Sequence, residues 1–138
     1  MNRTQEQLIV KAFFEKQIQE RVLHELSSPK KRLDALNRLC HSYSTTLRKK
    51  YLIELSKANF NKKDLETLLR KYGPIKQCYV ISWNKDIDGK EMPLSTALEH
   101  TVGLGMPSII SCIPGELAYF ESEQGYGAPP RYVLKRNA

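Results

Sequence analysis

The side chains best suited to chemistry lie in one acidic segment in the second half of the chain. Asn84, Asp86 and Asp88 place side-chain oxygens at the first, third and fifth positions of a calcium-binding loop, and Gly89 follows at the sixth. The twelfth position is Ser95, where such a loop requires a carboxylate that binds through both oxygens. The sequence therefore predicts a plain turn at Asp88–Gly89 and no metal site.

The same segment also resembles one part of a nuclease centre. Asp88-Gly89-Lys90 matches the Asp-x-Lys end of a metal-dependent nuclease core, where the carboxylate holds a cation and the lysine steadies the attacking water or phosphate. Further carboxylates would have to approach from the end of a strand that we predict at residues 116–121. The alternative function is thus a metal-dependent phosphoester hydrolase or nuclease. Its catalytic candidates are Asp86, Asp88, Lys90, Glu121 and Glu123.

Cysteine and histidine offer no clear site in the sequence. Cys112 and His100 would form a reactive thiolate–imidazole pair if they met, but Cys112 lies within an apolar strand and His100 lies off the apolar face of its helix. His24 and His41 have no metal-ligand spacing with any Cys or His, so we predict no zinc site. No phosphate-binding glycine pattern or Gly-x-Ser-x-Gly motif is present, and no cofactor is predicted.

The charge of the chain is distributed unevenly. The net charge is +7, and residues 1–74 hold 16 Lys and Arg against 8 Asp and Glu, while residues 75–138 hold 6 against 7. A positive surface attracts phosphate-bearing polymers or acidic proteins. A solvated surface that only keeps the protein soluble remains the alternative.

The basic clusters within residues 1–74 define the leading hypothesis for function. We expect a small non-enzymatic binding or regulatory protein whose basic helical face contacts a polyanion, such as nucleic acid, or an acidic protein. Oligomeric state is left open. The predicted partner-binding residues are Lys30, Lys31, Arg32, Arg48, Lys49 and Lys50.

Apolar residues at helical spacing predict four helices before Gly73-Pro74. The first is expected from an N-cap at Thr4 to Leu26, with Leu8 on its apolar face, and the second from Ser28 to Cys40, with Leu33 on its face. The third is expected from Ser44 or Thr45 to before Asn59. The fourth is expected from an Asn61 N-cap to Tyr72.

After Gly73-Pro74 the apolar period changes from helical to alternating, which predicts strands. Residues 78–83 form the first strand, a helix from Leu94 to Val102 follows, and residues 108–113 and 116–121 form an antiparallel hairpin around Pro114-Gly115. A strand, a helix and a strand in succession predict a parallel pair joined by a right-handed crossover. Tyr132–Leu134 reads as a final strand.

The predicted class is therefore α+β, with a four-helix region followed by a small mixed β-sheet that has one crossover helix. Its 138 residues suit a single domain with a basic helical half, residues 1–74, and an α/β half, residues 75–138. Three unpaired cysteines in apolar patterns, with no signal peptide or membrane span, favour the cytoplasm. Residues 124–131, which contain Tyr126, are expected to form a loop.

Overall fold

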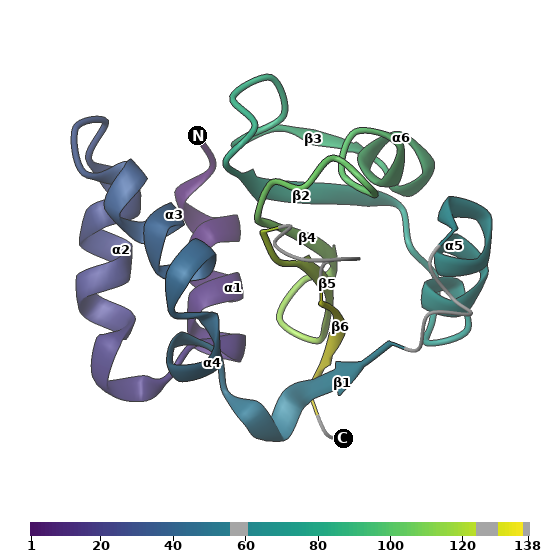
Figure 1. Cartoon of the computed structure of the whole chain (residues 1–138), viewed down its shortest axis with the longest axis horizontal. Helices are drawn as coiled ribbons and strands as arrows, with labels where there is room; N and C mark the ends of the chain where they lie inside the picture. Colours follow the sequence, from purple (N-terminus) through teal and green to yellow (C-terminus); the bar gives the residue numbers. More distant parts are fainter. Residues whose placement is uncertain (56–60, 124–129, 137–138) are drawn as a thin grey trace.

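A six-stranded antiparallel sheet divides the helices into two groups, with α1–α4 on one side and α5 and α6 on the other (Figure 1). The computed structural model describes residues 1–55, 61–123 and 130–136. The strand order is β1-β6-β5-β4-β2-β3. The strands are β1 (Leu52–Glu54), β2 (Gln77–Ser82), β3 (Glu91–Pro93), β4 (Ser108–Ile113), β5 (Leu117–Glu121) and β6 (Arg131–Lys135). The helices are α1 (Arg3–Phe13), α2 (Gln19–Ser27), α3 (Arg32–His41), α4 (Tyr43–Thr46), α5 (Lys62–Arg70) and α6 (Leu94–Glu99), with short 3-10 turns η1 (Lys16–Ile18) and η2 (Lys49–Tyr51).

The central strands are apolar on both faces because both faces are covered. Successive side chains of a strand point to opposite sides, so Ile81 packs toward α1–α3 while Val80 packs toward α5 and α6. The hairpin of β4 and β5 lies at the centre, with Ile110 opposite Tyr119. Gly115 takes a φ of 74° at its turn, which is a conformation that suits glycine. The α+β class is confirmed.

The predicted parallel pair is wrong, because β2 and β4 are antiparallel neighbours. The alternation of apolar residues does not predict the short strand β3. The turn at Asp88–Gly89 reverses the chain, so that β3 pairs with β2. The crossover helix α6 therefore starts from β3, and β3 and β4 run in the same direction with β2 between them. One unrecognised reversal of the chain thus turns the expected mixed sheet into an antiparallel one.

The first predicted helix is also wrong in its length and its cap. The Asn2 side chain, and not Thr4, caps α1, and the helix ends at Phe13. Phe14 takes an extended conformation and forms an isolated antiparallel bridge with Leu47. Both side chains are buried, so tertiary packing overrides the helical spacing of the apolar residues here.

The third predicted helix is not formed as expected. Of the described residues in this range, 44–55, only those of α4 are α-helical. The chain then passes through the 3-10 turn η2 into β1, which pairs with β6 as an edge strand. Leu47, Tyr51 and Leu55 are all buried, but along an extended path that has turns. The sheet therefore takes a strand from residues 1–74 as well as five from 75–138.

Smaller differences concern helix ends and faces. α3 begins at Arg32 and not directly after an N-cap at Ser28, and α6 ends at Glu99, before Val102. Leu8 and Leu33 are exposed, although both were expected on buried faces. The Asn61 N-cap of α5 is confirmed, since its side chain accepts a hydrogen bond from the Asp64 amide. Most of the predicted loop around Tyr126 lies outside the described residues.

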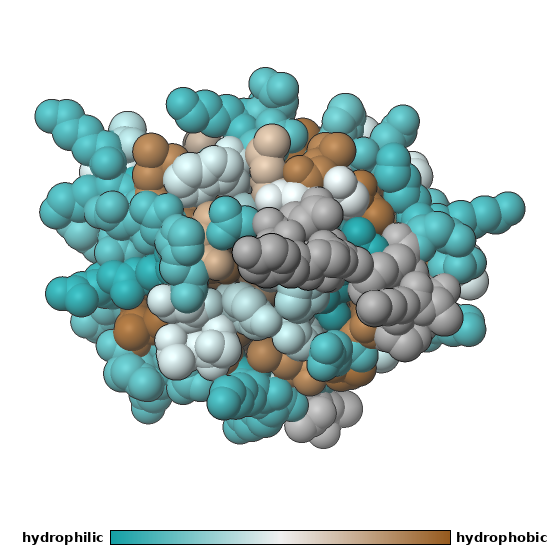
Figure 2. Space-filling view, viewed as in Figure 1, coloured by the Kyte–Doolittle hydropathy of each residue, from teal (hydrophilic) through white to brown (hydrophobic). Residues whose placement is uncertain are grey.

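Hydrophobic side chains reach the viewed surface only in small groups among hydrophilic ones (Figure 2). Among the described helices, none is long and apolar enough to span a membrane. Two depressions lie on the surface of the molecule, one between α1 and α2 and one lined by residues 15–16, 44 and 48–50.

Candidate polyanion-binding site

Arg32, a predicted partner-binding residue, is buried and forms the centre of an ion-pair cluster. Its guanidinium group donates to both carboxylate oxygens of Glu6, at 2.9 and 2.6 Å, and to both oxygens of Asp88, at 2.7 and 3.0 Å. It also donates to the Leu26 carbonyl at 2.9 Å. Because Arg32 is 6 % exposed and these partners use its donors, its role is to join α3 to α1 and to the loop after β2.

Two further hydrogen bonds connect this ion-pair cluster to the sheet. The Tyr79 hydroxyl of β2 donates to Glu6 at 2.6 Å, and the Ser82 amide donates to Asp88 at 3.0 Å. Burial, helped by the neighbouring Glu6 carboxylate, raises the pKa of Tyr79. The cluster is therefore a structural connection between the first helical layer and the sheet.

The carboxylates of the alternative hydrolase do not come together. Asp88 is held by Arg32, Asp86 is exposed in the turn, and Lys90 is exposed after it. Glu121 is fully buried on β5, where it accepts hydrogen bonds from the Tyr119 hydroxyl at 2.9 Å and the Gly103 amide at 3.2 Å and forms an ion pair with Arg131. Among the described residues, no three of these carboxylates lie close enough together to hold a metal ion.

Cys112 and His100 do not form a reactive pair either. Cys112 is buried, with its thiol 3.6 Å from the Ile110 carbonyl oxygen, while His100 is exposed after α6. The Cys78 thiol beside it, together with burial, raises the pKa of Cys112 well above its ordinary value. Burial and this neighbour therefore favour the neutral form of the Cys112 thiol.

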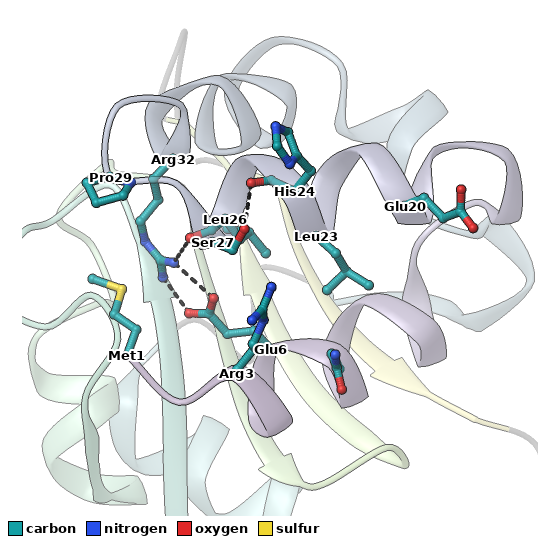
Figure 3. A pocket seen from close by; sticks show the side chains of 11 residues that line it. Met1, Arg3, Glu6, Glu20, Leu23, His24, Leu26, Ser27, Pro29 and Arg32 are labelled. Carbon is teal, nitrogen blue, oxygen red and sulfur yellow. Dashed lines mark hydrogen bonds and ion pairs between the residues drawn. The ribbon is translucent and has the colours of Figure 1, made fainter.

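The larger surface depression, of about 650 Å³, lies between α1 and α2 (Figure 3). The Glu6–Arg32 pair is visible in it, and Arg3, Glu20 and His24 also contribute to its lining. Its charges are mixed, and its arginine at position 32 is already bonded to two carboxylates. The depression therefore shows no preference for a cationic or an anionic ligand.

The second depression, of about 460 Å³, is strongly basic. Its lining includes the cations Lys16, Arg48, Lys49 and Lys50, and Glu15 is its one acidic lining residue. We call this the basic corner. Lys16, Lys49 and Lys50 are exposed, and Arg48 is half-buried. Four cations beside one carboxylate favour an anionic ligand.

A short tertiary pairing creates the basic corner. The Arg48 amide donates to the Phe13 carbonyl and the Glu15 amide donates to the Thr46 carbonyl, both at 2.8 Å. The Arg48 side chain donates through Nε to the Phe14 carbonyl at 2.9 Å. The break after α1 and the segment after α4 are thus held side by side, which brings Lys16 to the predicted cluster at residues 48–50.

The positive charges at and near the basic corner affect the ionisation of Tyr51. Lys50 lies 5.0 Å and Arg136 lies 4.7 Å from the centre of its ring. Burial opposes ionisation of Tyr51, but the charges and hydrogen bonds of Lys50, Arg136 and Arg48 outweigh it and lower the pKa of the hydroxyl. Negative charge is therefore stabilised at this place.

The sequence pattern singled out only some of the cations that meet at the basic corner. Arg48, Lys49 and Lys50 were predicted, whereas Lys16 and Arg136 were missed because they come from distant segments of the chain. Lys30 and Lys31 are exposed just before the first residue of α3. α3 is about 15 Å long, and α4 follows its other end, so these two lysines are separated from residues 48–50 by the length of that helix. The predicted residues therefore lie in two separate places.

No family model, curated protein or solved structure matches the chain.

Proposed function

We propose that the protein is a non-enzymatic binding protein that holds the phosphate backbone of nucleic acid at the basic corner. The observation that carries this proposal is the convergence of Lys16, Arg48, Lys49 and Lys50 on one depression with a single carboxylate. Lysine and arginine side chains neutralise phosphates and release counterions, which supplies most of the affinity in nonspecific binding.

The chemistry of the corner favours backbone contacts over base recognition. Its cations are mainly lysines, which act as flexible point charges. The neighbouring aromatic residue, Tyr51, is 6 % exposed and so offers no open ring face for stacking. We therefore expect weak sequence selectivity and a strong dependence of affinity on salt.

The test is a fluorescence anisotropy titration of labelled single-stranded and double-stranded DNA and RNA over a range of salt concentrations. In the variant Lys16→Gln/Lys49→Gln/Lys50→Gln, we expect weaker binding and a slope of log K against log salt that is smaller by about three. These three side chains are exposed, so the variant should unfold at nearly the same temperature as the wild type.

The matched control is Lys62→Gln/Lys63→Gln/Lys71→Gln, which removes the same amount of charge from exposed positions in and just after α5. Its salt slope should equal that of the wild type. Equal loss of binding in both variants would show that only net charge matters. No binding by the wild type at low salt would overturn the proposal.

A further inference from the structure

A thiol, an imidazole and a carboxylate meet on the surface at the end of α3. The possible ligand atoms of Cys40, His41 and Glu123 all lie within 4.8 Å of one another. The His41 Nδ1 atom is 3.9 Å from the Glu123 Oε2 atom. Within the described part of the chain, this is the one group of three such residues close enough to hold a metal ion.

Two elements position these side chains. Cys40 and His41 are the last two residues of α3, and Glu123 follows β5 after Ser122. Cys40 is half-buried, whereas the side chains of His41 and Glu123 are 69 % and 49 % exposed. The two exposed side chains can therefore adjust their positions around an ion that Cys40 anchors.

The donor set matches a zinc-type ion. Cysteine sulfur, histidine nitrogen and glutamate oxygen are the ordinary protein ligands of Zn²⁺, with bonds of about 2.0–2.3 Å. Tetrahedral geometry with such bonds puts ligand atoms about 3.3–3.8 Å apart, so each pair of ligand atoms must approach by at most about 1.5 Å to close the group around an ion. A thiolate and an imidazole do not suit Ca²⁺ or Mg²⁺, which prefer oxygen ligands.

The electrostatics of the place also favour a cation. The carbonyl end of α3 carries the negative end of the helix dipole. A thiolate and a carboxylate together balance the charge of a divalent ion, and the thiol proton passes to solvent when the ion binds.

We propose that Cys40, His41 and Glu123 form a binding site for Zn²⁺ or a similar divalent transition-metal ion. With three protein ligands, the fourth tetrahedral position is left for water. The site differs from the basic corner in its residues and in the sign of its charge, so it is independent of the proposed polyanion binding.

The test is a titration of the untagged, reduced protein with Co²⁺, followed by displacement with Zn²⁺. The wild type should develop thiolate-to-cobalt absorption with one-to-one stoichiometry, and Zn²⁺ should remove it. Cys40→Ser should abolish this absorption although Cys78 and Cys112 remain. His41→Gln and Glu123→Gln should each weaken Zn²⁺ affinity about tenfold or more, as measured by competition with a chromogenic chelator.

His24→Gln is the matched control, because His24 is an exposed histidine outside the group, and its affinity should equal that of the wild type. Circular dichroism of each variant verifies folding, and the two variants at exposed positions keep the test valid if Cys40→Ser does not fold. Absence of cobalt absorption in the wild type would overturn the proposal. Equal affinity in wild type, His41→Gln and Glu123→Gln would also overturn it.

Discussion

At the level of single residues, burial separates cations that look equivalent in the sequence. Lys30, Lys31 and Arg32 form one basic run, yet the lysines are exposed while Arg32 is bonded to Glu6 and Asp88. A buried arginine with two carboxylate partners serves the fold, because removing it leaves charges without compensation. Arg32 is therefore unsuitable for neutralisation in a binding experiment.

Replacing Arg32 with methionine should destabilise the protein strongly. The change leaves Glu6 buried and Asp88 largely shielded from solvent without their cation, and we expect a loss of about 3–5 kcal/mol in the free energy of unfolding. Lys31→Met, at the neighbouring exposed position, should change it by less than about 0.5 kcal/mol. Urea denaturation of the two variants measures both values, and similar effects would contradict the structural role of Arg32.

Glu121 should make stability depend on pH. Burial raises the pKa of this carboxyl above its ordinary value of 4.5, despite hydrogen bonds and the Arg131 cation that favour ionisation. The folded protein then holds the proton more tightly than the unfolded chain does. The contribution of Glu121 to stability is therefore full below pH 4.5 and is lost as pH rises through the raised pKa of the folded state.

The comparison with Glu121→Gln isolates this contribution. The variant has no titrating group at this position, whereas all other carboxyl groups are shared with the wild type. The melting temperature of the wild type minus that of the variant should fall as the pH rises from about 4.5 toward neutrality. A difference that stays constant, as measured by thermal melting at several pH values, would show that Glu121 titrates normally.

At the level of elements, a few buried side chains decide where helices stop. Phe14 and Leu47 are 1 % and 0 % exposed, and their bridge holds an extended segment where the spacing of apolar residues predicts continuous helix. The same bridge places Lys16 beside Arg48. The basic corner thus depends on the Phe14–Leu47 contact, which the local spacing of residues does not predict.

Leu47→Ala should destabilise the protein by about 2–5 kcal/mol, because it opens a cavity in the core next to Arg48. Leu33→Ala is the matched control, since Leu33 is 44 % exposed and its truncation should have a small effect. Chemical denaturation measures both. If Leu33→Ala lowered the free energy of unfolding as much as Leu47→Ala, Leu33 would be buried as the sequence pattern predicts, and the described packing of α3 would be wrong.

At the level of the whole molecule, the sheet is open and antiparallel, and its strands differ in how well they are shielded from solvent. β4 and β5 are central and buried on both faces, whereas β1 and β3 are short edge strands. Local opening requires less free energy where few apolar contacts and hydrogen bonds are lost.

Amide hydrogen exchange should follow this order. The amides of Ile110 and Tyr119 should exchange only by global unfolding, and those of β1 and β3 should exchange faster by local opening. NMR or mass spectrometry after transfer to D₂O measures the rates. Equal protection of β1 and β4 would be inconsistent with the strand order.

Local patterns were enough to predict the α+β class, the strands β2, β4, β5 and β6, the Asn61 cap of α5 and the excess of positive charge in residues 1–74, because these features depend on periodicity, capping and composition. Tertiary structure decided the rest. β3 reversed the chain and made the sheet antiparallel, and the Phe14–Leu47 bridge broke one helix and assembled the basic corner. Burial assigned Arg32 to the fold, and the end of α3 met Glu123. These outcomes depend on contacts between residues far apart in the chain, which the spacing of residues along the sequence does not encode.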